Sequence, residues 1–296
     1  MSRSCRLAGF SIFLLVLSLP ALAQPRPRRF AAPEVSSVPG VDGTSFAETL
    51  RAPKSGRIAP NVAHDESDNS LIFPLAGNAP GANGTFFRSE ATLVNNLNRQ
   101  QKVRVWFFPL GGNSCSGVPI KDLTLNPFAW YVWSDFVAQV FNLNGLGSIG
   151  LIAIDSIGNV DPTARVDMAL RIYTPAFGGG SASQTFQGVG LSDFGGNQTA
   201  FGLRHDSAFR TNYGIFNYLG NTRTFDISFV GLGNTSASSV LTVGPCSVGF
   251  TGIPNLNYGS VLMDIQPRDT QGGWYGFASS VDNVSGDSWS VSARPN

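Results

Sequence analysis

Histidine, cysteine and charged side chains are all scarce in this sequence. Its 296 residues include 2 His and 3 Cys, and only 13% are charged, about half the usual share in a soluble protein. So little charge excludes a coiled coil and a charged disordered chain. The abundant residues are glycine, with 34, and phenylalanine, with 22, which favours strands joined by glycine-rich turns. The length fits one large domain or two ordinary ones.

The motifs that most often carry catalysis are absent. The sequence holds no GxSxG elbow, HExxH helix, CxxC pair or phosphate-binding loop. A zinc site would need mainly carboxylate ligands, and the acidic residues are too scattered to suggest a glycosidase pair. His205 and Asp206 are adjacent, so in a strand they would point to opposite faces and could not share one nucleophile. We therefore predict no catalytic residue, no metal site and no cofactor.

The first 24 residues have the three parts of a secretory signal. Arg3 and Arg6 precede an apolar run at 7–19, and Ala21 and Ala23 follow it, as signal peptidase requires. We predict a signal peptide over 1–23, cleaved after Ala23, with a retained anchor and a lipoprotein signal as rivals. No later stretch has the roughly 18 apolar residues of a membrane span. The expected location is secreted, periplasmic or at the cell surface.

Charge is unevenly distributed along the chain. Residues 61–296 carry 12 basic and 16 acidic side chains, so they lack the basic surface of a nucleic-acid-binding protein. The basic cluster at 26–29 is either a solvated tail or a contact for anionic lipid or polysaccharide. Residues 24–69 are rich in Pro, Ala, Ser and Arg without any apolar period, which predicts a disordered linker. We interpret 64–68, with His64, as its polar end rather than a calcium loop.

Internal similarity is the most informative feature of the sequence. Residues 87–110 and 209–232 match without gaps at an offset of 122, too long for a solenoid repeat and about right for one domain. The identical pairs include Phe87 and Phe209, Arg88 and Arg210, Asn95 and Asn217, Leu97 and Leu219, Phe107 and Phe229, and Leu110 and Leu232. The pattern indicates a tandem duplication.

Each copy has the period of β-strands. Apolar residues alternate with mostly polar ones at 102–107 and at 224–229, as in an antiparallel sheet that covers a core. Turns suited to a hairpin or a sheet crossing precede these segments, at 96–99 and 218–221. Further strands are expected at 70–73, 150–154, 169–173, 239–243, 260–265 and 274–281. We predict an all-β protein of two antiparallel β-sandwiches, over 70–180 and 181–296.

One short helix is expected in the first copy only. Ser134 suits the N-cap, four apolar residues from Phe136 to Phe141 share one face, and Gly145 would end the turn. Four aromatics precede it at 128–133. Trp130, Tyr131 and Trp133 either stack on sugar rings or pack beneath the helix as core.

Two other sets of residues leave alternatives open. Arg88 and Arg210 occupy matched sites, where each either braces a turn carbonyl or carboxylate or binds a ligand. Cys5 leaves with the signal, so Cys115 and Cys246 remain in an oxidising compartment. They either form a disulfide or remain two separate buried thiols.

The chain also resembles a known class of exported proteins. The stretches 81–89, 208–212 and 277–287 are similar to tandem immunoglobulin-like domains in exported proteins of environmental bacteria. The resemblance covers residues 70–290 and implies cell-surface sandwiches without catalytic residues. We therefore expect a noncatalytic surface, spacer or adhesion-type protein, with a cell-surface polysaccharide or another exported protein as partner. A carbohydrate-binding protein using Trp130 is the alternative, and an uncharacterised hydrolase is least favoured.

Overall fold

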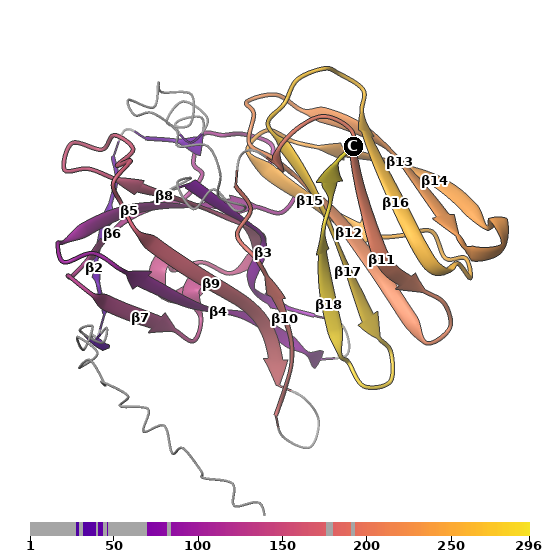
Figure 1. Ribbon diagram of the computed structural model, residues 1–296, viewed down its shortest axis with the longest axis horizontal. Coiled ribbons are helices and arrows are strands. Elements are labelled where there is room, and N and C mark those ends of the chain that lie inside the picture. The colour runs from indigo at the N-terminus through magenta and orange to yellow at the C-terminus, as the bar shows by residue number, and fades with distance from the viewer. Residues whose placement is uncertain are drawn as a thin grey trace, which may run out of the picture.

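The computed structural model describes residues 28–29, 32–39, 41–43, 46, 70–81, 84–175, 180–190 and 193–296. The predicted signal peptide over 1–23 and His64 lie outside them. The described residues are mostly strands, arranged as antiparallel sheets with little helix (Figure 1). The all-β fold predicted from the sequence, with a short helix in the first sandwich, is confirmed.

Eight strands build the first sandwich. They are β3 (Ser70–Pro80), β4 (Phe86–Asn95), β5 (Gln101–Pro109), β6 (Ile120–Leu125), β7 (Ala129–Trp133), β8 (Gly145–Ile154), β9 (Val166–Pro175) and β10 (Ser181–Phe186). One sheet has the order β6-β5-β8-β3 and the other the order β7-β4-β9-β10. The two sheets also join where the end of β3 pairs with the start of β4.

Eight strands with the same order build the second sandwich. They are β11 (Gln198–His205), β12 (Phe209–Asn217), β13 (Arg223–Gly231), β14 (Ser236–Val243), β15 (Ser247–Gly252), β16 (Gly259–Pro267), β17 (Trp274–Asp282) and β18 (Ser288–Ser292), with a 3₁₀ turn, η4 (Leu232–Asn234), before β14. Its sheets run β14-β13-β16-β11, extended by β19 (Arg294–Pro295), and β15-β12-β17-β18. The order matches the first sandwich strand for strand.

The immunoglobulin-like label stays a prediction. In the constant-type immunoglobulin order, the first strand lies in the sheet of the second strand. Here β3 pairs along most of its length with β8, and it meets β4 only at Ala79 and Pro80. The structure therefore supports the broader class, a pair of packed antiparallel sheets, without that strand order.

The alternating pattern of the sequence sets the core of each sandwich. Val103, Val105 and Phe107 of β5 point into the first core, as Phe225, Ile227 and Phe229 of β13 point into the second. Each of the six further segments expected as strands lies within a longer strand. Both turns, at 96–99 and 218–221, carry the chain from one sheet of the sandwich to the other.

The outer face of β5 departs from the expected polar character. Trp106 and Phe108 point away from the first core, yet both are fully buried, in a cluster that includes Phe216 and Cys246 of the second sandwich. Figure 1 shows why, because the sheet β15-β12-β17-β18 faces the first sandwich while β13, β14 and β16 lie on the far side. The sheet of β5 therefore has apolar contacts on both faces.

The predicted helix is present but shorter and of another type. It is a single π-helical segment, η2 (Val137–Phe141), whose apolar side chains enter the first core. The expected cap, Ser134, does not cap this helix. The carboxylate of Asp135 instead accepts a hydrogen bond from the backbone N–H of Ala138 at 3.2 Å. Asn142 ends it in the left-handed conformation with φ 56°, three residues before the expected Gly145.

The predicted disordered linker is wrong for the part that the structure describes. β2 (Glu34–Ser37) pairs antiparallel with β6, and β1 (Arg28–Arg29) pairs parallel with β7. Phe46 is fully buried between the sandwiches. The sequence does not reveal β1 and β2, because they are strands of two and four residues. Strands this short, which join a sheet edge by backbone pairing, show no apolar period.

The predicted boundary at residue 180 also needs correction. Ser181–Phe186, assigned to the second sandwich, pairs antiparallel with β9 from Pro175 to Leu170 and places Phe186 in the first core. The first sandwich therefore extends at least to Phe186.

Candidate functional site

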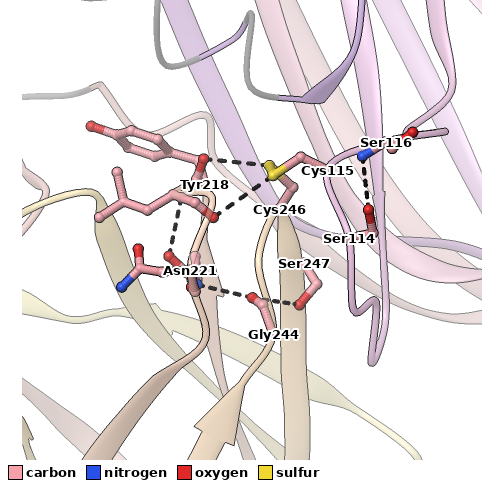
Figure 2. The surroundings of a disulfide bond; sticks show 10 residues. Ser114, Cys115, Ser116, Tyr218, Asn221, Gly244, Cys246 and Ser247 are labelled. Atoms are coloured by element: carbon pink, nitrogen blue, oxygen red, sulfur yellow. Dashed lines mark hydrogen bonds between the residues drawn. A yellow bond between two sulfur atoms is a disulfide. The ribbon is translucent and has the colours of Figure 1, made fainter.

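The best-defined site among the described residues is the joint between the two sandwiches. Cys115, in the loop between β5 and β6, is disulfide-bonded to Cys246, in the turn between β14 and β15 (Figure 2). The Cα atoms are 5.0 Å apart, and the bond closes a sequence separation of 131 residues. Of the two alternatives left open by the sequence, the structure therefore has the bridged pair.

Backbone contacts surround the disulfide on both sides. The N–H of Gly111 donates to the carbonyl of Val248 at 2.9 Å, and the N–H of Gly43 donates to the carbonyl of Cys115 at 2.9 Å. Gly244 approaches so closely that a Cβ there would clash with the carbonyl oxygen of Gly112. Residues from the N-terminal segment and from both sandwiches thus meet at this one place.

Phe46 fills the apolar part of the joint. Its ring centroid lies 5.0 Å from that of Trp106, 5.3 Å from Phe108 and 5.9 Å from Tyr218, each time in an edge-to-face arrangement. Two of these partners belong to the first sandwich and one to the second. Sequence reasoning missed Phe46, because one aromatic residue within a Pro- and Ser-rich stretch carries no period to mark it as core.

The matched asparagines form equivalent corners in the two copies. Asn95 donates its amide protons to the carbonyls of Arg99 and Asn126, at 2.8 and 2.9 Å, and accepts from the N–H of Leu97 at 3.0 Å. Asn217 makes the same three contacts with Asn221, Gly244 and Leu219, at 2.9, 2.9 and 3.1 Å. Both asparagines are fully buried, so they fix the sheet crossing that follows β4 and β12.

Arg88 and Arg210 both contact a nearby turn. Nε of Arg88 lies 3.8 Å from the carboxylate of Asp135, before η2, and its guanidinium lies over Phe86. Arg210 donates to the side-chain oxygen of Asn283 at 2.8 Å. These partners agree with a bracing role in each copy.

The phenylalanines that precede the two arginines have different surroundings. Phe87 packs against the first core, and the second sandwich places Phe209 beneath Arg204 and 5.8 Å from Trp289. Phe87 and Phe209 are the same residue at matched positions, but their neighbours differ. They therefore do not define a binding site common to both copies.

The aromatics before the helix do not form a shared surface. Tyr131 is 1% exposed and Trp133 7% exposed, and both lie in the first core, where Trp133 contacts Phe136 edge to face at 5.2 Å. Trp130 is half-buried on the opposite face of β7. The structure therefore places two of the three candidate sugar-binding residues in the first core.

His205 and Asp206 have separate partners. The Nδ1 atom of His205 accepts a hydrogen bond from the N–H of Thr211 at 3.0 Å, and burial lowers the pKa of the imidazole below 6.5. The carboxylate of Asp206 accepts from Nε of Arg204 at 2.8 Å, which lowers the pKa of that carboxyl. The two side chains therefore do not form an acid–base pair.

Arg223 is a buried charge that sequence reasoning missed. It forms a two-point ion pair with Asp269 and donates to the carbonyls of Gln271 and Gly272. The hydrogen bond from Arg223 lowers the pKa of Asp269. At the matched position, the first copy has the neutral Gln101, so this ion pair belongs to the second copy alone.

The described part of the chain has neither a metal-binding cluster nor a membrane-spanning helix. It holds no cluster of three or more His, Cys, Asp or Glu that could hold a metal ion. It also contains no helix long and apolar enough to cross a bilayer. No protein-family model matches this chain, and neither a curated protein nor a solved structure matches it. The geometry of the joint is thus the main basis for a functional proposal.

Proposed function

We propose that this chain is a noncatalytic exported protein, secreted, periplasmic or bound at the cell surface, in which two β-sandwiches act as one stiff unit. Its role would be that of a surface, spacer or adhesion-type module. The partner would be a cell-surface polysaccharide or another exported protein. The signal-like N-terminus and the resemblance to tandem sandwich domains of exported bacterial proteins both favour this proposal.

The observation that carries the proposal is the disulfide between the sandwiches. Structural disulfides persist in oxidising compartments and are rare in reducing ones. The pairing of Cys115 with Cys246 therefore supports export. Because the bond joins two sandwiches rather than two strands of one, its main effect is on how the sandwiches are held together.

The packing around the disulfide supports a stiff unit. Domains joined by a small polar interface usually move relative to one another, whereas this interface buries Trp106, Phe108, Phe216 and the inserted Phe46. A hinge motion would expose these rings to water. A stiff pair suits a protein that sets a distance or transmits a load between two attachment points.

Export is tested by expressing the full sequence in a bacterial host and analysing the mature product. We expect a chain that begins at Gln24, lies outside the cytoplasm and has no free thiol when denatured without reductant. The control lacks residues 2–23 and should stay in the cytoplasm with both thiols free. A full-length product held in the cytoplasm with an intact signal would contradict the proposal.

The role at the cell surface is tested by binding of the mature protein to a polysaccharide panel and to whole envelopes. A surface or spacer protein should bind an exported protein or a polysaccharide in a way that Trp130→Ala leaves unchanged. Loss of sugar binding in Trp130→Ala alone would favour the carbohydrate-binding alternative. Turnover of any substrate during the same assays would contradict the noncatalytic proposal.

A further inference from the structure

Matched edges of the two sandwiches have different neighbours. In the first sandwich, β6 lies between β5 and β2, and β2 pairs with it from Glu34 opposite Thr124 to Ser37 opposite Lys121. The matched strand of the second sandwich is β14, which pairs with β13 along its length. Within the described ranges of the chain, β14 ends its sheet with no strand on its other side.

The sequence of β14 does not protect this edge. Natural sheet edges are commonly blunted by charged residues, proline or a bulge, because an open row of N–H and C=O groups is a template for another strand. β14 reads SASSVLTV, eight residues with no charge, proline or glycine, and it pairs with β13 without a bulge. The matched strand β6 carries Lys121 and Asp122 and is covered as well.

We propose that β14 pairs antiparallel with β14 of a second copy of this chain, so that the two second sandwiches share one continuous sheet. Antiparallel pairing of a strand with itself is two-fold symmetric, the commonest symmetry of homodimers. The uncharged sequence brings no like charges into opposition, which is the usual obstacle to self-pairing. The proposal is independent of the function proposed above, because it rests only on the strand edge.

The pleat of the strand limits the register of this pairing. Ser236, Ser238, Val240 and Thr242 point away from the core, and Val240 is 53% exposed. Two strands in one sheet must place outward residues opposite outward residues. The registers with greatest overlap therefore put Val240 opposite either Val240 or Ser238 of the second copy, with Cβ atoms about 5 Å apart.

The mass of the oxidised protein in solution tests the pairing. Sedimentation velocity from about 1 to about 100 μM should show twice the chain mass, a range that covers the affinity of ordinary homodimers. Val240→Lys should weaken the dimer at least about tenfold, because it places an ammonium group on both sides of the new pair. The matched control is Val230→Lys, which changes an outward residue, 46% exposed, on the inner neighbour β13 and should leave the dimer intact.

Crosslinking tests the same contact without depending on the stability of the lysine variant. Val240→Cys with a short bis-maleimide should give a covalent dimer in either register, whereas Val230→Cys should remain single chains. A single-chain mass at all concentrations would overturn the proposal. So would a dimer that Val240→Lys leaves unchanged, which would point to another interface, such as exchange of β2 between copies.

Discussion

The two sandwiches share one strand order and differ in how their margins are covered. In the first, β1 and β2 cover the edges of β7 and β6, and η2 fills one part of the core. In the second, no described strand covers β14, and among the described residues the outer edge of β15 meets the first sandwich by the bridge between Val248 and Leu110. The two sandwiches thus share a framework, while their margins have different neighbours.

The disulfide lies at a position that has an equivalent in the first sandwich. Phe128 and Cys246 occupy the same place after the matched corners, with φ values of 50° and 47°. Their N–H groups donate to the carbonyls of Leu97 and Leu219, at 2.9 and 3.0 Å. Left-handed backbone is uncommon for residues other than glycine, so its presence in both copies shows that the corner fixes this conformation. Cysteine at that place turns the corner of the second copy into an attachment for the first.

Removal of the disulfide should have the largest effect on this comparison. Closing a loop of 131 residues stabilises by about 4–5 kcal/mol in the chain-entropy description. We expect the double variant Cys115→Ser with Cys246→Ser to lose about that much and to unfold in two calorimetric steps instead of one. A single transition at an unchanged Tm would show that the apolar joint suffices alone. Each single variant serves as a control for the effect of the serine.

Truncation of Phe46 should weaken the joint from the N-terminal side. Phe46→Ala empties a buried site between three aromatic rings and should cost about 3–4 kcal/mol of unfolding free energy. Phe201→Ala is the matched control, since Phe201 is largely exposed on β11 and should change stability by less than about 0.5 kcal/mol. Urea unfolding measures both. Equal effects would show that Phe46 does not hold the sandwiches together.

The asparagine corners offer a direct test of equivalence between the copies. Asn95→Ala and Asn217→Ala each remove a buried amide that makes three hydrogen bonds, which should cost about 1–3 kcal/mol. We expect the larger loss for Asn217→Ala, because its partner Gly244 lies beside the disulfide. Unfolding of both variants with and without reductant measures this coupling. The difference between the two losses should shrink when the disulfide is absent.

The smallest expected difference between the two sandwiches is in how stability depends on pH, through His205 of the second sandwich. Burial lowers the pKa of His205, whose neutral Nδ1 accepts from Thr211. The unfolded chain then binds the proton more readily, so stability should fall as pH drops below about 6.5. His205→Asn, which keeps an acceptor and does not titrate, should lose this part of the slope. Tm measured from pH 7.5 to 5.0 checks it, and parallel curves would contradict it.

Much of the fold could be predicted from the sequence, because the alternation that identifies a strand is a local pattern. Alternation at 102–107 and 224–229 identified the core faces of β5 and β13, and the matched segments indicated two copies. Shorter strands such as β10 and β15, which are rich in Ser or Gly, were not predicted because they lack a regular apolar alternation. The helix was placed correctly, but its cap and end depended on Asp135 and Asn142, which local propensity ranked below Ser134 and Gly145.

The joint could be predicted only in part. The sequence narrowed the choice to bridged or separate thiols for Cys115 and Cys246, since pairing depends on a Cα separation that sequence does not contain. Trp106 fell on the face expected to be polar, and Phe46 fell in an expected linker. Both became core because a second sandwich covers them, which is a property of the assembled chain.

The scarcity of charge and histidine, the signal-like start and the repeat at an offset of 122 were readable from residues alone. The strand periods and the repeat together identify an all-β protein made of two similar units, because both are local, one-dimensional patterns. Only the tertiary structure decided that the units share a buried joint, that part of the N-terminal segment covers the first unit, and that the edge of β14 in the second is uncovered by any described strand. Those outcomes depend on which surfaces meet, and contacts between residues more than a hundred positions apart leave no periodic trace in sequence.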